Sequence, residues 1–260
     1  MPRVTTEATR RSVEGQLVYA IGDIHGRYDL LERLLRQIAA DAAARAVGRR
    51  PILVFCGDYV DRGPDAAKVL AALGWLRGRA DYEVRLLLGN HEQAMLRFIA
   101  DPDDGRDWLG FGGAATVRAY GIEPPDVDAD AVVLVTMRDS LLDAMPASHL
   151  YLVQSLETLL TIGDYAFCHA GVRPGRKLAD QSLDDLLWIR APFLEWAKPF
   201  EKVIVHGHTW TSDEPTIGGS RIGIDTGAYE TGVLTAVRLE DGELAIIQAR
   251  GAAVPTLYAD

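Results

Sequence analysis

Short apolar runs alternate with amphipathic segments through the first hundred residues. Three runs are largely apolar along their whole length, as strands buried on both faces are, and they span residues 17–21, 52–56 and 84–88. The segments that follow place apolar residues at helical spacing, over residues 28–38, 65–76 and 92–100. A strand-then-helix order repeated three times predicts a parallel sheet with crossover helices.

The pattern changes after residue 100. Residues 101–130 are rich in glycine, proline and aspartate, which indicates an inserted loop region with one short helix, and residues 131–144 have a helical pattern. Short strand-like runs follow at residues 151–153, 157–162, 165–168, 221–224, 232–239 and 243–248, with Gly163-Asp164 and Asp241-Gly242 as hairpin turns. We therefore predict an α/β fold in which two sheets pack together with helices on their outer faces, in α-β-β-α layers.

Polar residues follow five of the apolar runs, at the ends where α/β sheets build their sites. They are Asp23 and His25, Asp58, Asn90, His169, and the pair His206 and His208. Carboxylates, imidazoles and an amide carbonyl are ligands for divalent ions of the Mn, Fe and Zn kind. The pattern therefore predicts a site for two metal ions.

Each ligand candidate has a place in such a site. Asp23 and His25 are two residues apart, so they point to the same side of an extended backbone. Asp58 is the candidate bridge between the ions, while Asn90, His169 and either His206 or His208 complete the set. Two such ions about 3.5–4 Å apart hold one hydroxide as nucleophile, which predicts in-line displacement at phosphorus.

Four further residues are candidates for proton transfer and phosphate binding. His91 follows Asn90 directly and points elsewhere if Asn90 binds metal, so it is placed to protonate the leaving oxygen, and Asp61 could orient its imidazole. Arg62 and Arg190 are candidates for gripping phosphate oxygens, with Asn90 and His91 beside them.

Each motif also has a purely structural interpretation. The glycines and Asp23 could form a turn before a helix, Asn90-His91 could be an ordinary helix start, and Arg190 could be a surface arginine without a role. Trp188 and Trp196 fit a core position at helical spacing. The occurrence of all these elements in one order, each after an apolar run, favours the metal site.

Composition narrows the class of protein. The chain has 260 residues, 48% of them hydrophobic and 25% charged, and a net charge of −10, which disfavours a nucleic-acid polymer as partner. The two cysteines, Cys56 and Cys168, lie in apolar runs and are expected to be buried free thiols. No stretch is apolar enough to span a membrane, and residues 1–14 are expected to be a disordered lead-in without a signal-peptide core. A reducing, cytoplasmic setting is the default expectation.

The motifs resemble those of the calcineurin-like metallophosphoesterases. Gly-Asp-x-His-Gly, Gly-Asp-x-x-Asp-Arg-Gly and Gly-Asn-His-Glu stand at residues 22–26, 57–63 and 89–92, and the resemblance covers residues 17–248. It is closest to the phosphoprotein-phosphatase branch, which includes serine/threonine phosphatases, the lambda phosphatase and symmetrical diadenosine tetraphosphatases. The resemblance implies a single catalytic domain over residues 15–250, followed by a tail over residues 251–260.

The resemblance also implies roles for particular residues. It places one ion on Asp23, His25 and Asp58, and the other on Asp58, Asn90, His169 and His208. The acid–base pair matches His91 and Asp61, and the phosphate-binding arginines match Arg62 and Arg190. Trp210 replaces the last histidine of the superfamily motif, so His206 is expected to lie outside the ligand set, and residues 108–113 resemble an active-site flap.

The expected activity is hydrolysis of phosphomonoesters, with phosphoserine or phosphothreonine in proteins as the substrate and Mn as the metal, Fe and Zn being alternatives. Symmetrical hydrolysis of dinucleoside tetraphosphates is the second hypothesis, since it uses the same catalytic core. A non-catalytic phosphate-binding adaptor is the third, and the presence of every expected ligand disfavours it.

Overall fold

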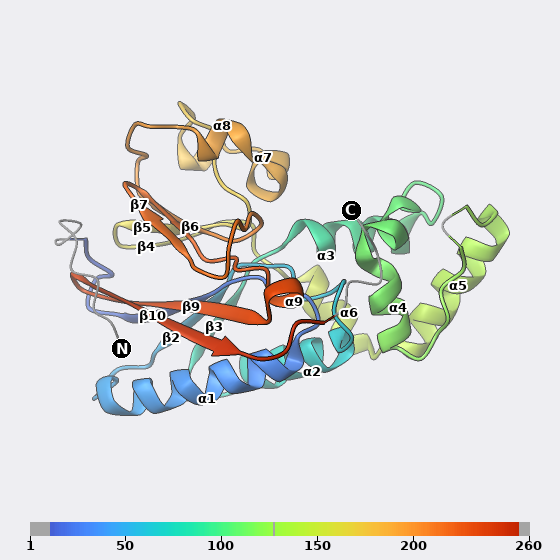
Figure 1. Ribbon diagram of the computed structural model, residues 1–260, viewed down its shortest axis with the longest axis horizontal. Coiled ribbons are helices and arrows are strands. Elements are labelled where there is room, and N and C mark those ends of the chain that lie inside the picture. Colours follow the sequence, from blue (N-terminus) through green and yellow to red (C-terminus); the bar gives the residue numbers. More distant parts are fainter. Residues whose placement is uncertain (1–10, 127, 255–260) are drawn as a thin grey trace.

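A computed structural model describes residues 11–126 and 128–254 (Figure 1). Its first sheet is mixed, because the neighbours β1, β2 and β3 run parallel while β9 and β10 form an antiparallel extension of the sheet. In spatial order its strands are β10 (Glu243–Arg250), β9 (Val233–Glu240), β1 (Leu17–Ile21), β2 (Ile52–Phe55) and β3 (Glu83–Leu86). The parallel part carries the three motifs of the first half of the chain.

The second sheet is built from the second half of the chain. Strand β5 runs parallel to β6, and β6 to β8, while β4 and β7 form antiparallel edges. In spatial order its strands are β4 (Leu160–Ile162), β5 (Tyr165–Phe167), β6 (Val203–His206), β8 (Arg221–Gly223) and β7 (Thr216–Gly218). The predicted two-sheet α/β fold is confirmed, but the first sheet is less parallel than the repeated strand–helix order predicted, because the last two strands of the chain, β9 and β10, join it.

The side chains of β1 show how the layers fit together. Leu17, Tyr19 and Ile21 face a core shared with the helices, while Val18 and Ala20 face a core shared with Phe167, Val205 and Ile222 of the second sheet. A strand that is buried on both faces needs apolar side chains at every position, which explains the continuous apolar run. Helices α1 (Tyr28–Arg45) and α2 (Ala66–Arg77) lie against the first sheet (Figure 1), and α3 (Asn90–Ala100) adds Met95 and Phe98 to the same core. A third cluster joins Ala166 and Ile204 to Leu186 and Phe193 of α7 (Leu183–Trp188) and α8 (Ala191–Leu194), which completes the α-β-β-α layers.

The inserted region between the sheets is more helical than predicted. It contains the π-helical segment η1 (Leu109–Gly113), α4 (Ala114–Ala119), α5 (Ala131–Ala144) and α6 (Ala147–Gln154). The strand predicted at residues 151–153 was wrong, because these residues belong to α6, where Leu152 and Val153 are buried while Tyr151 is exposed. Three adjacent apolar residues are too few to distinguish the period of a strand from that of a helix. The remaining short helices are η2 (Leu178–Asp180) and α9 (Ala228–Thr231).

The described ends of the chain are bound to the body of the protein. Val13 is fully buried, and the backbone N–H groups of Ser12 and Val13 donate to the carboxylates of Asp164 and Asp241. The expected lead-in therefore does not extend to residues 11–14, and its residues 1–10 lie outside the described residues. Residues 251–254 of the expected tail are likewise hydrogen-bonded to the body of the protein, and its residues 255–260 lie outside the described residues.

Two smaller expectations concern membranes and thiols. Within residues 11–126 and 128–254, no helix is both long enough and apolar enough to cross a membrane. Cys56 and Cys168 are buried free thiols, as predicted.

Candidate metal centre

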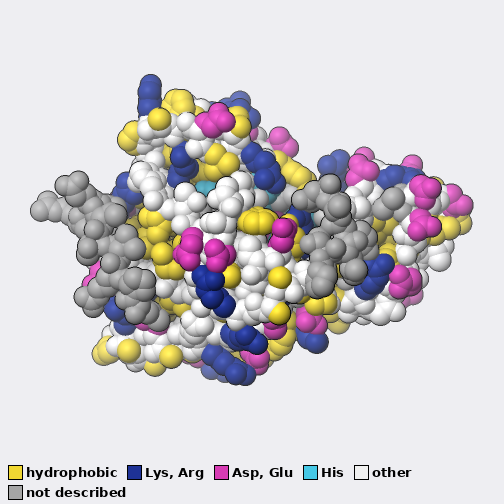
Figure 2. Space-filling view, in the orientation of Figure 1, with side chains coloured by type: hydrophobic (Ala, Val, Ile, Leu, Met, Phe, Trp, Pro, Cys, Tyr) yellow, Lys and Arg dark blue, Asp and Glu magenta, His cyan; other side chains and the backbone are white. Residues whose placement is uncertain are grey.

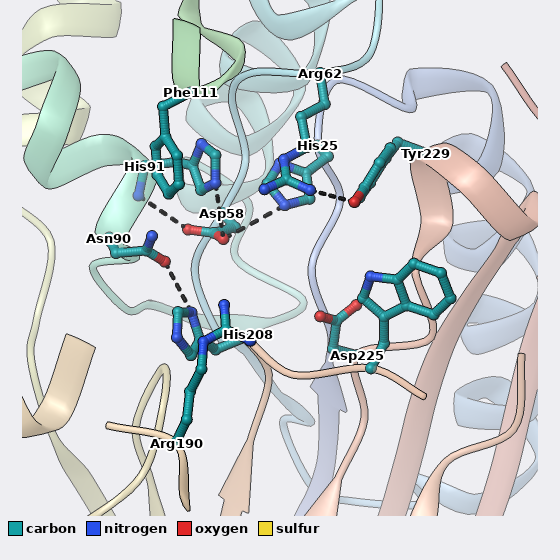
Figure 3. Close-up of a pocket in the computed structure, with 11 residues that line it drawn as sticks. His25, Asp58, Arg62, Asn90, His91, Phe111, Arg190, His208, Asp225 and Tyr229 are labelled. Carbon is teal, nitrogen blue, oxygen red and sulfur yellow. Dashed lines mark hydrogen bonds and ion pairs between the residues drawn. The ribbon is translucent and has the colours of Figure 1, made fainter. Parts of the chain in front are cut away.

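Loops from both sheets meet at one polar pocket with a volume of about 370 Å³. Figure 3 shows its side chains pointing toward a common centre, and Figure 2 shows histidine side chains within a face of the molecule, next to lysine and arginine. The pocket is lined by His25, Asp58, Arg62, Asn90, His91, Phe111, Arg190, His208, Trp210, Asp225 and Tyr229. Seven of the sequence-predicted residues thus line one pocket. Asp23 and His169 lie just behind its wall, where both contact residues that line it.

Backbone hydrogen bonds hold the first two ligand loops against each other. The N–H groups of Ile24 and His25 both donate to the carbonyl oxygen of Asp58, at 3.0 and 2.8 Å. Two glycines allow the carboxylates to come close. A Cβ atom at Gly89 would lie 2.1 Å from Asp58 Oδ1, and one at Gly207 would lie 1.9 Å from Asp23 Oδ1. Only glycine fits at these two positions without moving a candidate ligand.

Backbone strain is concentrated in the same loops. Among the described residues, six non-glycine residues have positive φ angles, and all but Glu14 belong to the candidate site: His25, Asp58, Asp61, Arg62 and His208, at 45° to 70°. Such conformations cost about 1–3 kcal/mol each and persist where the surrounding structure enforces them. Their clustering indicates that these loops are held in shape for a function.

Asp58 lies at the centre of the candidate ligands. Its Oδ2 atom is 3.4 Å from His25 Nε2, and its Oδ1 atom is 3.4 Å from His169 Nε2. Asn90 Oδ1 is 2.7 Å from His169 Nε2 and 3.0 Å from His208 Nδ1. Atoms bound to one ion at about 2.1 Å lie roughly 3–3.5 Å apart, so these separations suit two sets of ligands that share Asp58.

Carbonyl oxygens orient two of the imidazoles. His25 Nδ1 is 2.9 Å from the carbonyl oxygen of Val60, and His169 Nδ1 is 2.8 Å from that of Cys56. A proton on each Nδ1 atom leaves Nε2 as the electron-pair donor facing Asp58. This is the usual arrangement behind a metal-binding histidine, because the second hydrogen bond fixes both the tautomer and the ring.

The electrostatics of the site favour a bound cation. Burial raises the pKa of Asp23 and Asp58 well above the usual range, and burial lowers the pKa of His25 and brings that of His169 to about 4. Two buried atoms, Asp23 Oδ1 and His208 Nε2, have no hydrogen-bond partner within the described part of the chain. Carboxylates with neutral imidazoles and unused lone pairs are the donor set that divalent metals require, so these residues fit the ions that the sequence predicted.

His91 and Asp61 form a buried pair at the edge of the pocket. His91 Nδ1 is 2.7 Å from Asp61 Oδ2, which also accepts from Trp108 Nε1 at 2.9 Å, while Thr116 Oγ1 donates to Asp61 Oδ1 at 2.6 Å. Burial raises the pKa of Asp61 to about 7, against the lowering effect of these hydrogen bonds, and burial lowers the pKa of His91. The remaining nitrogen, His91 Nε2, faces the pocket 3.9 Å from Asp58 Oδ2, so His91 could also join His25 and Asp58 around an ion.

Two arginines and several aromatic rings form the mouth of the pocket. The guanidinium of Arg62 lies 4.6 Å from the centre of the Tyr229 ring and donates to its hydroxyl. Arg190 is exposed on the pocket wall, where Nη1 reaches Thr209 Oγ1 at 3.5 Å. The ring of Phe111, in the expected flap, stacks on His91 with the ring centres 4.2 Å apart.

The expectation that Trp188 is a core residue was wrong. Trp188 is 36% exposed, packs on Phe111 and donates through Nε1 to Gln93. Its spacing on a helix fits a buried stripe, but α7 is short and ends at the pocket, so the ring covers the flap instead. Trp196 is partly buried.

Three residues near the site were not singled out by the sequence. Glu92 accepts hydrogen bonds from the N–H groups of Asp58, Tyr59 and Val60, so it holds the ligand loop in shape. Tyr229 contacts Arg62, as described above. Asp225 lines the pocket, and the signal that could have found it is an aspartate at the end of an apolar run, although Ile224 and not a glycine precedes it.

His206 lies outside the pocket. It is buried, its Nδ1 is 3.0 Å from the carbonyl oxygen of Gly207, and its ring contacts Phe193 on the outer side of the second sheet. Of the two candidates at this motif, His208 is therefore the one beside Asn90, and His206 is not a pocket residue.

The two-sheet fold, the candidate ligands around Asp58 and the order of the motifs are together those of one class of protein, the calcineurin-like phosphoesterases. The family model for the calcineurin-like phosphoesterases matches residues 17–231, and the chain belongs to that family.

Similar proteins differ in what they act on. The symmetrical bis(5'-nucleosyl)-tetraphosphatase of Xanthomonas euvesicatoria pv. vesicatoria is 30% identical over 157 residues, which are 60% of this chain and 39% of that protein. The serine/threonine-protein phosphatase 2 of Escherichia coli K12 is 34% identical over 98 residues, which are 37% of this chain and 38% of that protein. This chain thus spans about two fifths of the length of the curated relatives that it matches.

A solved structure supports the fold. A crystal structure provisionally described as a diadenosine tetraphosphatase superposes with a TM-score of 0.60 at 20% identity and covers 93% of this chain and 97% of its own. At that identity the likeness supports the two-sheet fold alone.

Proposed function

We propose that this protein hydrolyses phosphomonoesters with two divalent metal ions, and that its substrate is phosphoserine or phosphothreonine in proteins. The observation that carries the proposal is the pairing of two ligand sets around Asp58 with a buried His91–Asp61 pair beside them. Ligands for two cations, a proton donor and two arginines are what phosphoryl hydrolysis needs in one place.

The ligand assignment follows the motifs, because the structure groups His25 and Asp58 with His91, and Asp58 with His169 and His208, without Asp23. Asp23, His25 and Asp58 would hold one ion, and Asp58 would also hold the second. The other ligands of the second ion would be Asn90, His169 and His208. When bound, the ions neutralise phosphate charge and activate water for attack. Manganese is the metal we expect, with iron and zinc as alternatives that the same donors accept.

His91 is the proposed general acid. A carboxylate at Asp61 would accept from Nδ1–H and stabilise the imidazolium form of His91, whose second proton, on Nε2, faces the pocket and would go to the leaving oxygen. Trp108 and Thr116 fix Asp61 in turn, and Phe111 holds the face of the imidazole. A proton donor that cannot rotate delivers its proton along one direction, which fits a leaving group on the flap side of the phosphate.

Arg62 and Arg190 are the proposed phosphate-binding residues. Both line the pocket, and a monoester dianion offers three non-bridging oxygens to two guanidinium groups and two ions. A neighbouring groove of about 600 Å³ is lined by Phe111, which also lines the pocket, and by Trp188, so a leaving group as large as a peptide residue has room.

Symmetrical hydrolysis of dinucleoside tetraphosphates is the second candidate. It is favoured by the names of the Xanthomonas relatives, which share about 30% identity with part of this chain. The site residues described above would serve either reaction, because both break a P–O bond next to the same ions. The third hypothesis, a non-catalytic adaptor, is disfavoured because the acid–base pair and both ligand sets are complete.

A substrate panel would test these alternatives. Chelator-stripped protein reconstituted with Mn²⁺ is assayed on a phosphoserine peptide, a phosphothreonine peptide, diadenosine tetraphosphate and p-nitrophenyl phosphate. Higher kcat/KM on the phosphopeptides supports the proposal, and higher kcat/KM on diadenosine tetraphosphate replaces it with the second candidate. Absence of metal-stimulated turnover on every substrate would favour the adaptor.

The cytoplasm is the setting that we propose for this activity. Both cysteines are free and buried, which agrees with a reducing compartment. Fractionation of cells that express the chain, with the protein followed by antibody, would test this setting.

A further inference from the structure

Asp225 lies where the two sheets meet, directly beside Asp23. The backbone after β8 runs against the backbone after β1 so closely that a Cβ atom on Gly22 would lie 2.2 Å from the carbonyl oxygen of Ile224. Asp23 and Asp225 are the next residue on each side of this contact. Asp225 lines the pocket together with His25 and Asp58 (Figure 3).

Two buried carboxyl groups on adjacent loops repel each other unless a proton or a cation near them offsets their negative charge. Asp23 is 1% exposed and Asp225 is 6% exposed, so water cannot screen their repulsion. Asp23 Oδ1 has no hydrogen-bond partner among the described residues, although Oδ2 accepts from the N–H of His208. This unpartnered oxygen atom is a second, independent indication that a cation binds on this side of the pocket.

Asp225 is held in place by its own loop. Its Oδ1 atom accepts from the N–H of Gly227 at 2.9 Å, and Gly227 has a φ of 64° with no room for a side chain beside Trp210. Asp225 thus approaches the pocket from the end of β8, next to the loop after β6 that carries His208.

We propose that Asp225 contributes an oxygen ligand to the ion held by Asp23, His25 and Asp58. The contribution of Asp225 balances the two ligand sets. The second ion has Asn90, His169 and His208 besides the shared Asp58, whereas the first has only Asp23 and His25 besides it. With Asp225, each ion has three side chains of its own. This inference rests on the metal-dependent function proposed above, so its test measures metal binding without substrate.

The test compares the wild type with Asp225→Asn. The side-chain amide oxygen of this variant keeps the bond from Gly227 N–H while the charge is lost. Both proteins are stripped with chelator and titrated with Mn²⁺, and free Mn²⁺ is followed by electron paramagnetic resonance. We expect the dissociation constant of one ion to rise by roughly 10–100-fold, which is the usual effect of removing a side chain that supports a metal site. The dissociation constant of the other ion should stay within about twofold of the wild-type value. Asp213→Asn, which removes an exposed carboxylate paired with Arg250, is the matched control and should leave both constants unchanged.

Thermal unfolding of the stripped proteins separates metal binding from a structural role. Because Asp225→Asn removes repulsion from Asp23, the stripped variant should unfold at the same or a higher temperature, while Mn²⁺ should raise its Tm less than it raises that of the wild type. Asp225→Glu keeps the carboxylate and should bind Mn²⁺ more tightly than Asp225→Asn.

Two results would overturn the assignment of Asp225. One is unchanged dissociation constants for both ions in Asp225→Asn. The other is that stripped Asp225→Asn and stripped Asp225→Glu both unfold at a lower Tm than the stripped wild type and lose Mn²⁺ affinity equally. That result would make Asp225 a structural residue. If instead the wild type binds no Mn²⁺, the proposed function itself fails, and the two failures are thus distinguishable.

Discussion

The two sheets contribute to the site in different ways. The first sheet supplies Asp23, His25 and Asp58 from adjacent parallel strands whose loops are hydrogen-bonded to each other. The second sheet supplies His169, His208 and Asp225 from strands that are separated by long connections. Most of the negative charge thus sits on one rigid set of loops, while the other sheet adds mainly neutral imidazoles. Loss of a carboxylate from the first sheet should therefore weaken ion binding more than loss of an imidazole from the second sheet.

Asp58→Asn should have the largest effect, because this carboxylate is shared by both ligand sets. We expect Mn²⁺-dependent turnover to fall to background and the amount of bound manganese to fall. The reason is that the negative charge of Asp58, which would reduce the repulsion between the two cations, is lost. Metal content is measured by mass spectrometry after gel filtration, with the exposed Asp81→Asn as control. Two ions per chain together with near-normal turnover would exclude Asp58 as the bridge.

His91→Ala should have the next largest effect. The rate should fall by roughly 10²–10⁴-fold, as removal of a general acid does, while both ions stay bound. The loss should be smaller on p-nitrophenyl phosphate than on a phosphoserine peptide, because p-nitrophenolate leaves without protonation. Loss of one ion in this variant would instead make His91 a ligand, the alternative that its position beside His25 and Asp58 allows.

Removal of each pocket arginine compares the two sides of the site, since Arg62 follows β2 of the first sheet and Arg190 lies between α7 and α8, which pack on the second sheet. Arg62→Ala and Arg190→Ala should each lower kcat/KM on a phosphomonoester by roughly 10–100-fold, the usual value of a charged hydrogen bond. The effect on a phosphodiester should be smaller, because a diester offers one non-bridging oxygen fewer. Matched p-nitrophenyl substrates provide the measurement. An unchanged kcat/KM in Arg190→Ala would make Arg190 a surface residue and weaken the case for a monoesterase.

The smallest effect concerns the contact between the sheets. Gly207→Ala would place a Cβ atom 1.9 Å from Asp23 Oδ1, so we expect a loss of about 1–3 kcal/mol in the free energy of unfolding, as overpacking causes. Gly74→Ala, in an exposed turn of α2 with its nearest contact at 3.6 Å, is the matched control and should stabilise by about 0.5–1 kcal/mol. Urea unfolding of both variants measures the difference. Equal stability of the two would show that the sheets tolerate rearrangement at the site.

The same contrast explains what could be predicted from the sequence. The ligands of the first sheet stand within a few residues of strand ends, so a local pattern of an apolar run, a glycine and an aspartate predicted their meeting point. Asp225 also follows an apolar run but has Ile224 and not a glycine before it, and it lies among residues that were interpreted only as a meander. The strand predicted at residues 151–153 failed because short apolar runs carry no period, and Trp188 was misplaced because burial depends on where a short helix ends.

Other features of the site depend on contacts that a sequence pattern does not contain. The left-handed backbone of His25, Asp58 and Asp61 is enforced by neighbouring loops. The role of Glu92 as an acceptor for three N–H groups of the ligand loop likewise emerges only when α3 begins beside that loop. The fold class followed from periodicity, whereas these details follow from packing.

The chain beyond β10 has a practical consequence for work with this protein. Arg27, which is buried, donates from Nη1 to the carbonyl oxygen of Ala228 and from Nη2 to that of Ala252, and the N–H of Val254 donates to the carbonyl oxygen of Tyr229. Residues 252–254 therefore brace the helix that carries Tyr229 at the mouth of the pocket. An affinity tag fused close behind Val254, or a truncation at Arg250, would disturb the position of Tyr229 at the candidate site. A tag ahead of Arg11 would attach near Asp164 and Asp241, at the opposite ends of the strands from the metal ligands.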